Sequence, residues 1–267
     1  MKNSLLMRKH GKTFYWASFF LDKAKMQAIY SIYSNKGKSH PVISVLNNIP
    51  KENWPNQKLV KNFLNGQIYD IKFTSFKSEK ALIVYCYQVA GTVGLMVCDI
   101  FGVKDKKMRY FAIDLGIAMQ LINISRDIYE DSLRNRIYLP ESLIGKHSAK
   151  EIAYPTKEIA AKIDFTRKKL INQANIYFAS ASKAIDHLPR GAGLAVKLAS
   201  ALYQQIGHQL VQTQYQHKEK RCYVNTLCKV LITFKIITKF LLTFKVKLKP
   251  HDKNLHKFIM TLPDAHF

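Results

Sequence analysis

The stretch that decides the fold is QLINISRDIYEDSLRNRIYLP, which runs from Gln120 to Pro140. It places Asn123, Asp127 and Asp131 at i, i+4 and i+8, on one face of a predicted helix. Carboxylates stacked on one face repel each other unless a cation lies between them. Mg²⁺ prefers such hard oxygen ligands, together with substrate phosphates. The pattern therefore predicts a magnesium site formed by these three side chains.

Arg126, Arg134 and Arg136 lie close to this motif in the sequence. Guanidinium groups bind phosphate oxygens in pairs, so these arginines are expected to grip a diphosphate. The alternative is an exposed helix end on which Arg–Asp pairs only hold each other. However, most residues from Phe111 to Leu121 are apolar, which predicts a buried helix, and buried carboxylates need a partner or a metal. We interpret the segment as a metal–diphosphate site.

Two long segments carry a family resemblance. AIDLGIAMQLINISRDIYED, followed by RNRIYLP, resembles the second aspartate-rich motif of the squalene/phytoene synthase family, and YCYQVAGTVG (Tyr85 to Gly94) looks like its other signature segment. Shorter similarities lie at Lys12 to Tyr33, Asn65 to Asp70 and Tyr215 to Lys229, so the resemblance covers nearly the whole chain. Bacterial phytoene synthase is the most similar type. The resemblance implies a single all-α domain over residues 1–267, an isoprenoid synthase-type helical bundle around a central apolar cavity.

The distribution of glycine and proline agrees with an all-α fold. The chain has 11 glycines and 8 prolines, long helix-compatible stretches separate them, and no alternating strand pattern occurs. Helices are predicted over residues 13–33, part of 42–48, 57–70, 78–101, 106–131, 157–186 and 193–215, with a closing helix between 229 and 249.

The chain departs from the family pattern at the first aspartate-rich motif, which supplies the other half of the metal site. Ser34 is followed directly by NKGKSH, and no aspartate occurs between Asp22 and Asp70. The sequence reads as if a segment near residues 34–40 had been deleted. A second carboxylate facing Asp127 would then have to come from Asp22, Glu52, Asp70 or another acidic residue.

The resemblance also implies site residues. The expected catalytic residues are Asp127, Asp131 and Tyr33, and the expected metal ligands are Asn123, Asp127 and Asp131. The expected substrate-binding residues are His10, Lys12, Thr13, Tyr33, Tyr85, Val89, Gly94, Gln120, Arg126, Arg136 and Tyr215. The small residues Ala90, Gly91 and Gly94 have two explanations, tight helix packing or room for a prenyl chain, and the resemblance favours a tunnel wall.

The implied activity is a Mg²⁺-dependent head-to-head condensation of two isoprenyl diphosphates through a cyclopropyl-carbinyl diphosphate, with Mn²⁺ as an alternative ion. Geranylgeranyl diphosphate converted to phytoene is the first expectation. A squalene or hydroxysqualene-type synthase using farnesyl diphosphate is the second, and a catalytically impaired, non-enzymatic relative is the third. NADPH is not expected, because the close glycine pair Gly191 and Gly193 does not form a nucleotide-binding motif after a strand.

The formal charge of +24 over 267 residues suits an anionic partner. Lysine is spread along the chain and no nucleic-acid module is recognisable, so we expect no nucleic-acid partner and instead a peripheral contact with an anionic membrane. A lysine-rich genome would explain the charge equally well. The candidate membrane contact is Lys229 to Lys249, whose lysines do not gather on one face.

The remaining features point to a cytoplasmic chain, peripheral at most on the inner face of the membrane. No run of 18 uninterrupted apolar residues predicts a membrane span, and the N-terminal residues do not form a signal peptide. The widely spaced cysteines predict reduced, buried thiols rather than disulfides or a zinc site: Cys86, Cys98, Cys222 and Cys228.

Overall fold

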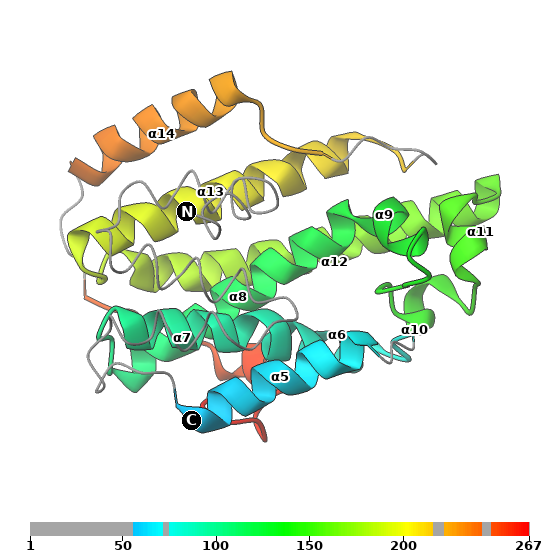
Figure 1. Cartoon of the computed structure of the whole chain (residues 1–267). Coiled ribbons are helices and arrows are strands. Elements are labelled where there is room, and N and C mark those ends of the chain that lie inside the picture. Colours follow the sequence, from blue (N-terminus) through cyan, green and yellow to red (C-terminus); the bar gives the residue numbers. More distant parts are fainter. Residues whose placement is uncertain (1–55, 72–74, 216–221, 242–246, 267) are drawn as a thin grey trace, which may run out of the picture.

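A computed structural model describes residues 56–71, 75–215, 222–241 and 247–266, and Figure 1 shows their arrangement. These residues form helices, turns and loops without a strand, which confirms the predicted all-α class. The helices predicted over 13–33 and 42–48 lie outside the described residues. The elements are α5 (Gln57–Ile71), α6 (Glu79–Cys86), the π-helical segment η2 (Tyr87–Gly91), α7 (Thr92–Ile100), α8 (Lys106–Arg126), α9 (Ile128–Ser132), α10 (Glu141–Ile144), α11 (Ala149–Ala153), α12 (Lys157–Ile185), α13 (Arg190–Gln212), α14 (Thr226–Leu241) and the 3₁₀ helix η3 (Lys253–His256).

Helix α8 is the centre of the bundle. It packs most extensively against α12, and it also contacts η2, α7 and α13 (Figure 1). Ile113, Ile117 and Leu121 are fully buried, and other buried residues of α8 lie around its whole circumference. This confirms the buried helix predicted from the apolar run before the aspartate motif, and it places that motif at the end of the central helix.

The helix predicted over 78–101 is one helical path with a π turn in its middle. Ser78 begins it as an N-cap, accepting a hydrogen bond from the amide of Ala81 at 3.3 Å. Where it crosses α8, a Cβ added to Gly94 would lie 2.3 Å from the carbonyl oxygen of Ala112. The mirror contact is as tight, since a Cβ on Gly116 would lie 2.3 Å from the carbonyl oxygen of Ala90. Packing of two helix backbones therefore explains these glycines, and a place for Gly94 beside a prenyl chain stays a prediction.

Among the described helices, the run from Glu79 to Ile100 is long and apolar enough to cross a membrane. However, 61% of its apolar window is buried inside the protein, as expected for a core helix. It packs on α8 rather than standing apart from the bundle.

Two predicted helix boundaries are corrected. The helix predicted over 106–131 ends at Arg126, because Asp127 has φ −99° and ψ 15°, and α9 then restarts the helix for one turn. The helix predicted over 193–215 begins earlier, directly after Pro189, and ends at Gln212, so Tyr215 lies in an extended segment beyond it. A proline suits the start of a helix because the first amides have no intrahelical partner.

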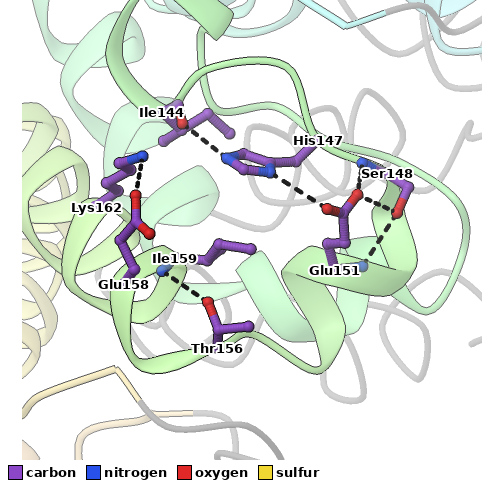
Figure 2. A network of polar contacts seen from close by, with 8 residues as sticks. All are labelled: Ile144, His147, Ser148, Glu151, Thr156, Glu158, Ile159 and Lys162. Atoms are coloured by element: carbon purple, nitrogen blue, oxygen red, sulfur yellow. Dashed lines mark hydrogen bonds and ion pairs between the residues drawn. The ribbon is translucent and has the colours of Figure 1, made fainter.

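The corner between α10 and α12 is held by helix caps, which Figure 2 shows. Ser148 and Glu151 form a capping box at the start of α11, and Thr156 caps α12 by accepting from the amide of Ile159 at 3.3 Å. His147 donates from Nε2 to the carbonyl of Ile144 at 2.9 Å. Because α11 also contacts α9, these caps fix the wall that faces the aspartate motif.

The C-terminal segment, residues 247–266, lies against α8 and α12 and next to α5 in Figure 1. Tyr177 of α12 donates to the carbonyl of Leu255 at 2.9 Å, and Tyr110 of α8 donates to that of His266 at 2.8 Å. Ile259 and Ala265 are fully buried. The segment is therefore part of the core.

Candidate active site

The three predicted metal ligands lie around the break between α8 and α9. The amide of Asp127 donates to the carbonyl of Asn123 at 2.9 Å, and that of Asp131 donates to the carbonyl of Asp127 at 2.8 Å. The helical hydrogen-bond ladder thus continues through the motif although the backbone bends at Asp127. Asn123 donates from Nδ2 to Oε1 of Gln120 at 3.4 Å, which brings the predicted substrate residue Gln120 to the same face.

Arg126 binds Asp127 rather than an external group. Its Nε donates to Oδ1 and its second guanidinium nitrogen to Oδ2, each at 2.7 Å, and both side chains are largely buried. Although burial alone would lower the pKa of Arg126, this two-pronged pairing raises it above the ordinary value. A metal ion or a diphosphate at this point would therefore have to compete for groups that already satisfy each other.

The carboxyl of Asp131 has a raised pKa. Burial and the negative charge of Asp127 raise its pKa to about 7, and the nearby Arg134 and Arg136 only partly oppose this. Two carboxylates that cannot both ionise freely are what a divalent ion relieves. The donor set, with two carboxylates and the Asn123 amide oxygen, fits a hard cation such as Mg²⁺.

Another acidic residue of this region is Asp70, which belongs to α5. Its Oδ1 accepts from the hydroxyls of Tyr85 and Tyr138, each at 2.9 Å, while Arg136 donates to the hydroxyl of Tyr138 at 3.4 Å. The negative charges of Asp70 and Asp131 both contribute to raising the pKa of Arg136. Asp70 is thus connected to Arg136 through the hydroxyl of Tyr138, and it also accepts from the hydroxyl of Tyr85. Asp22 and Glu52, the other expected partners of Asp127, lie outside the described residues.

A cluster of rings supports Asp70. Tyr69 stacks on Phe76 at 5.5 Å between centroids, and Tyr85 stacks on Tyr138 at 5.5 Å. Burial is the main reason that the pKa values of the Tyr85 and Tyr138 hydroxyls are raised above their usual range. Both tyrosines therefore remain neutral donors to Asp70. Sequence reasoning predicted Tyr85 but missed Tyr138, although it stands inside the quoted RIYLP element.

Asp131 and Arg136 line a small pocket together with mostly aliphatic side chains. It has room for about one water molecule in the absence of ligand. Its lining residues are Ile124, Ile128, Asp131, Arg136, Ile137, Tyr138, Leu139 and Ile152. The lining therefore places two charged side chains next to aliphatic ones.

Tyr215, a predicted substrate residue, is engaged in packing. Its hydroxyl donates to the carbonyl of Ile152 at 3.2 Å, its amide donates to Asp164 at 3.3 Å, and it is only 5% exposed. It anchors the chain after α13 to the wall that also lines the pocket. Val89 is half-buried against the core, and its Cγ1 would lie 2.7 Å from a Cβ on Gly66 of α5. A substrate contact of either residue stays a prediction.

The remaining predicted residues cannot be placed. His10, Lys12, Thr13 and Tyr33 lie outside the described residues. Of the predicted set, the structure brings together Asn123, Asp127, Asp131, Gln120 and Arg126 at the end of α8, with Arg136 and Tyr85 linked to them through Tyr138.

Comparison with a family profile and comparison with individual proteins identify the same family. The squalene/phytoene synthase family profile matches residues 27–228. The 15-cis-phytoene synthase of Enterobacter agglomerans is 36% identical over 160 residues, covering 59% of this chain and 54% of that protein. Phytoene synthase 2, chloroplastic, of Oryza sativa subsp. japonica is 34% identical over 177 residues, covering 64% of this chain and 44% of that protein. The chain thus spans about half the length of the curated relatives that it matches.

Solved structures agree on the fold. A dehydrosqualene synthase in complex with a ligand superposes with a TM-score of 0.71 at 22% identity, covering 91% of this chain and 96% of that one. YisP from Bacillus subtilis subsp. subtilis strain 168 also gives a TM-score of 0.71, at 15% identity, covering 87% and 94%. At these identities the likeness concerns the fold. Together with the profile match over most of its length, it shows that the chain belongs to the squalene/phytoene synthase family.

Proposed function

We propose that this protein catalyses the head-to-head condensation of two isoprenyl diphosphates, with geranylgeranyl diphosphate converted to phytoene as the preferred reaction. The observation that carries the proposal is the cluster at the end of α8. There Asp127 is paired with Arg126 and lies close enough to Asp131 to raise its pKa, and Asp131 and Arg136 line a small pocket together with aliphatic side chains. The family and the phytoene synthase relatives support the reaction class.

Asn123, Asp127 and Asp131 would hold Mg²⁺, which supplies Lewis-acid stabilisation of a diphosphate leaving group when bound. Arg126 would exchange its bidentate contact with Asp127 for one with diphosphate oxygens, freeing the carboxylate to act as a ligand. Arg136, held by Tyr138 next to Asp131, would contact the same phosphates. The aliphatic wall formed by residues such as Ile124 and Ile128 would exclude water from the allylic cation.

The proposed location is cytoplasmic, with α14 in peripheral contact with an anionic membrane on its inner face. Its outward side exposes Leu227, Val230, Leu231 and Phe234 at i, i+3, i+4 and i+7, a continuous apolar stripe, with Lys235 and Lys239 also exposed. The prenyl substrates and products are lipids, so a docking face beside a membrane suits the proposed chemistry.

A catalytically impaired relative is the second candidate, and a specific observation favours it. The first aspartate-rich motif is missing from the sequence, and Asp70 is already engaged by two tyrosine hydroxyls. One carboxylate cluster could then hold a single diphosphate without the second unit that the condensation needs.

Incubation of the purified full chain with geranylgeranyl or farnesyl diphosphate and Mg²⁺, with and without NADPH, tests the proposal. Extracted lipids are identified by mass spectrometry, and Asp127→Ala is the control. Phytoene that disappears in the variant supports the proposal. A C30 product in its place points to the squalene-type alternative. A folded protein that releases no pyrophosphate and forms no product overturns the proposed activity and leaves the impaired relative.

A further inference from the structure

A second cluster of metal-ligating side chains lies outside the candidate active site. Asp114 of α8 meets His251 and His256 of the C-terminal segment, and the ligand atoms of all three lie within 4.8 Å of one another. Asp114 Oδ2 is 2.7 Å from His251 Nε2, and Oδ1 is 2.9 Å from His256 Nε2. The three side chains are between 0 and 3% exposed.

This cluster is separate from the aspartate motif. Asp114 precedes Asn123 by nine residues on α8. At about 100° per residue this puts the two side chains on opposite faces of the helix. Asp114 faces the C-terminal segment, whereas Asn123 faces Gln120 at the other site.

The hydrogen bond of His256 to the main chain orients its ring within the cluster. Its Nδ1 lies 3.4 Å from the carbonyl oxygen of Ala265, which can only accept, so Nδ1 carries the hydrogen. Nε2 is then the ring nitrogen that faces the carboxylate of Asp114. A metal ion between Nε2 and the carboxylate would be bound by both groups.

We propose that Asp114, His251 and His256 bind a divalent transition-metal ion, for which Zn²⁺ is the best match. Two imidazoles and one carboxylate are a frequent zinc donor set, with a fourth position open to water. Ligand atoms around tetrahedral zinc are about 3–3.5 Å apart, so small side-chain shifts from the present contacts would admit the ion.

The surroundings have the form of an outer ligand shell. The Nδ1–H of His256 donates to a backbone carbonyl, the usual arrangement that fixes a metal-binding imidazole. The ring of Phe111 lies 5.1 Å from that of His251, and Tyr110 lies 5.6 and 5.9 Å from the two imidazoles. These rings restrict water around the ligands. A bound ion would join the C-terminal segment to the central helix.

The test uses the full chain after dialysis against a chelator. Isothermal titration with Zn²⁺ is expected to show one tight site that is weakened at least about tenfold by His256→Gln or Asp114→Asn. His208→Gln, which removes an exposed histidine of α13, should leave this site unchanged. Bound Zn²⁺ should also raise the melting temperature.

Co²⁺ provides a readout that survives if the buried variants fail to fold, because its visible spectrum reports tetrahedral coordination by nitrogen and oxygen. His251→Gln is the alternative variant. Absence of a tight site in the folded wild type overturns the proposal. Zinc binding that is unchanged in every folded cluster variant overturns it as well. No prenyl substrate enters these measurements, so they stand or fall independently of the proposed function.

Discussion

At the scale of single residues, the raised pKa of Asp131 predicts how the affinity for a metal ion depends on pH. Its pKa is raised to about 7 by burial and by Asp127, so the side chain holds a proton below neutrality. A metal must displace this proton. We expect the affinity for Mg²⁺ to rise about tenfold per pH unit up to about pH 7 and then to level off. Titration with Mg²⁺ or Mn²⁺ between about pH 5.5 and 8.5 measures this dependence.

The stability of the metal-free protein should change in the opposite sense. A carboxyl whose folded pKa is raised stabilises the fold below its unfolded pKa of about 4, and this contribution is lost as pH rises through about 7. Asp131→Asn should flatten both profiles, because it removes the titrating group and keeps the shape. An affinity for Mg²⁺ that is the same at both ends of the pH range would contradict the assignment.

Tyr138 gives a second expectation at this scale. Tyr138→Phe removes one of the two hydroxyls that donate to Asp70, and a hydrogen bond to a charged group contributes about 1.5–3 kcal/mol. Unfolding in denaturant should show a loss of this size. In an Asp70→Ala background the same change should cost much less, because the acceptor is gone. Equal costs in both backgrounds would show that the hydroxyl stabilises the fold in some other way.

At the scale of elements, α12 carries two ion pairs that should differ in strength. Arg167 is fully buried and donates to Asp164 at 2.8 Å, whereas Lys162 and Glu158 are exposed on the same helix and are 2.7 Å apart. Asp164→Ala should cost about 3–5 kcal/mol, because it leaves a buried charge without its carboxylate. Glu158→Ala, the matched control, should cost less than about 1 kcal/mol. Denaturant unfolding of both variants measures the difference.

The contribution of the Asp164–Arg167 pair to stability should decrease in acid. Despite its burial, the pKa of Asp164 is held below the usual range by hydrogen bonds from Lys168 and Arg167. A carboxyl with a lowered folded pKa stabilises the fold above its unfolded pKa of about 4, and that contribution is lost as pH falls through the lower folded value. If Asp164→Ala lost as much stability at pH 3 as at pH 7, the ionic origin of its effect would be refuted.

The sequence predicted the helices more accurately than the points at which they end or bend. The apolar run before the motif identified α8 as a buried helix, and the all-α class followed from the spacing of glycine and proline. The break at Asp127 could not be predicted, because the NxxxDxxxD spacing fits an unbroken helix. The pairing of Arg126 with its neighbour Asp127 was equally hidden, since adjacent residues on a helix do not normally face each other.

The other features that the sequence did not predict depend on long-range contacts. Nothing in the spacing of Asp114, His251 and His256 indicated that they meet, because 137 and 142 residues separate the pairs. Asp70 was named as a candidate partner of Asp127, but its contacts with Tyr85 and Tyr138 depend on how α5 crosses the bundle. Conversely, the predicted tunnel glycine Gly94 satisfies a local packing need that is visible only once α8 is in place.

At the scale of the whole molecule, the proposed membrane contact is based on the net charge of +24 and on the apolar stripe of α14. Phe234 is 69% exposed at the C-terminal end of that stripe, and burial of such a ring in a membrane contributes about 1.5–3 kcal/mol. Phe234→Ser should therefore weaken binding to phosphatidylserine vesicles by about 10- to 100-fold. Phe165→Ser is the matched control, because Phe165 is 66% exposed on α12, away from the stripe.

Sedimentation with vesicles of increasing phosphatidylserine content separates the two contributions. Lysine attraction should strengthen with anionic lipid and weaken with salt, whereas the contribution of Phe234 should persist at high salt. Equal loss of binding in the two serine variants would mean that α14 has no special role. Binding that salt abolishes completely, and that Phe234→Ser leaves unchanged, would assign membrane contact to charge alone. A salt-resistant contact that depends on Phe234 would instead orient the bundle with α14 against the lipid.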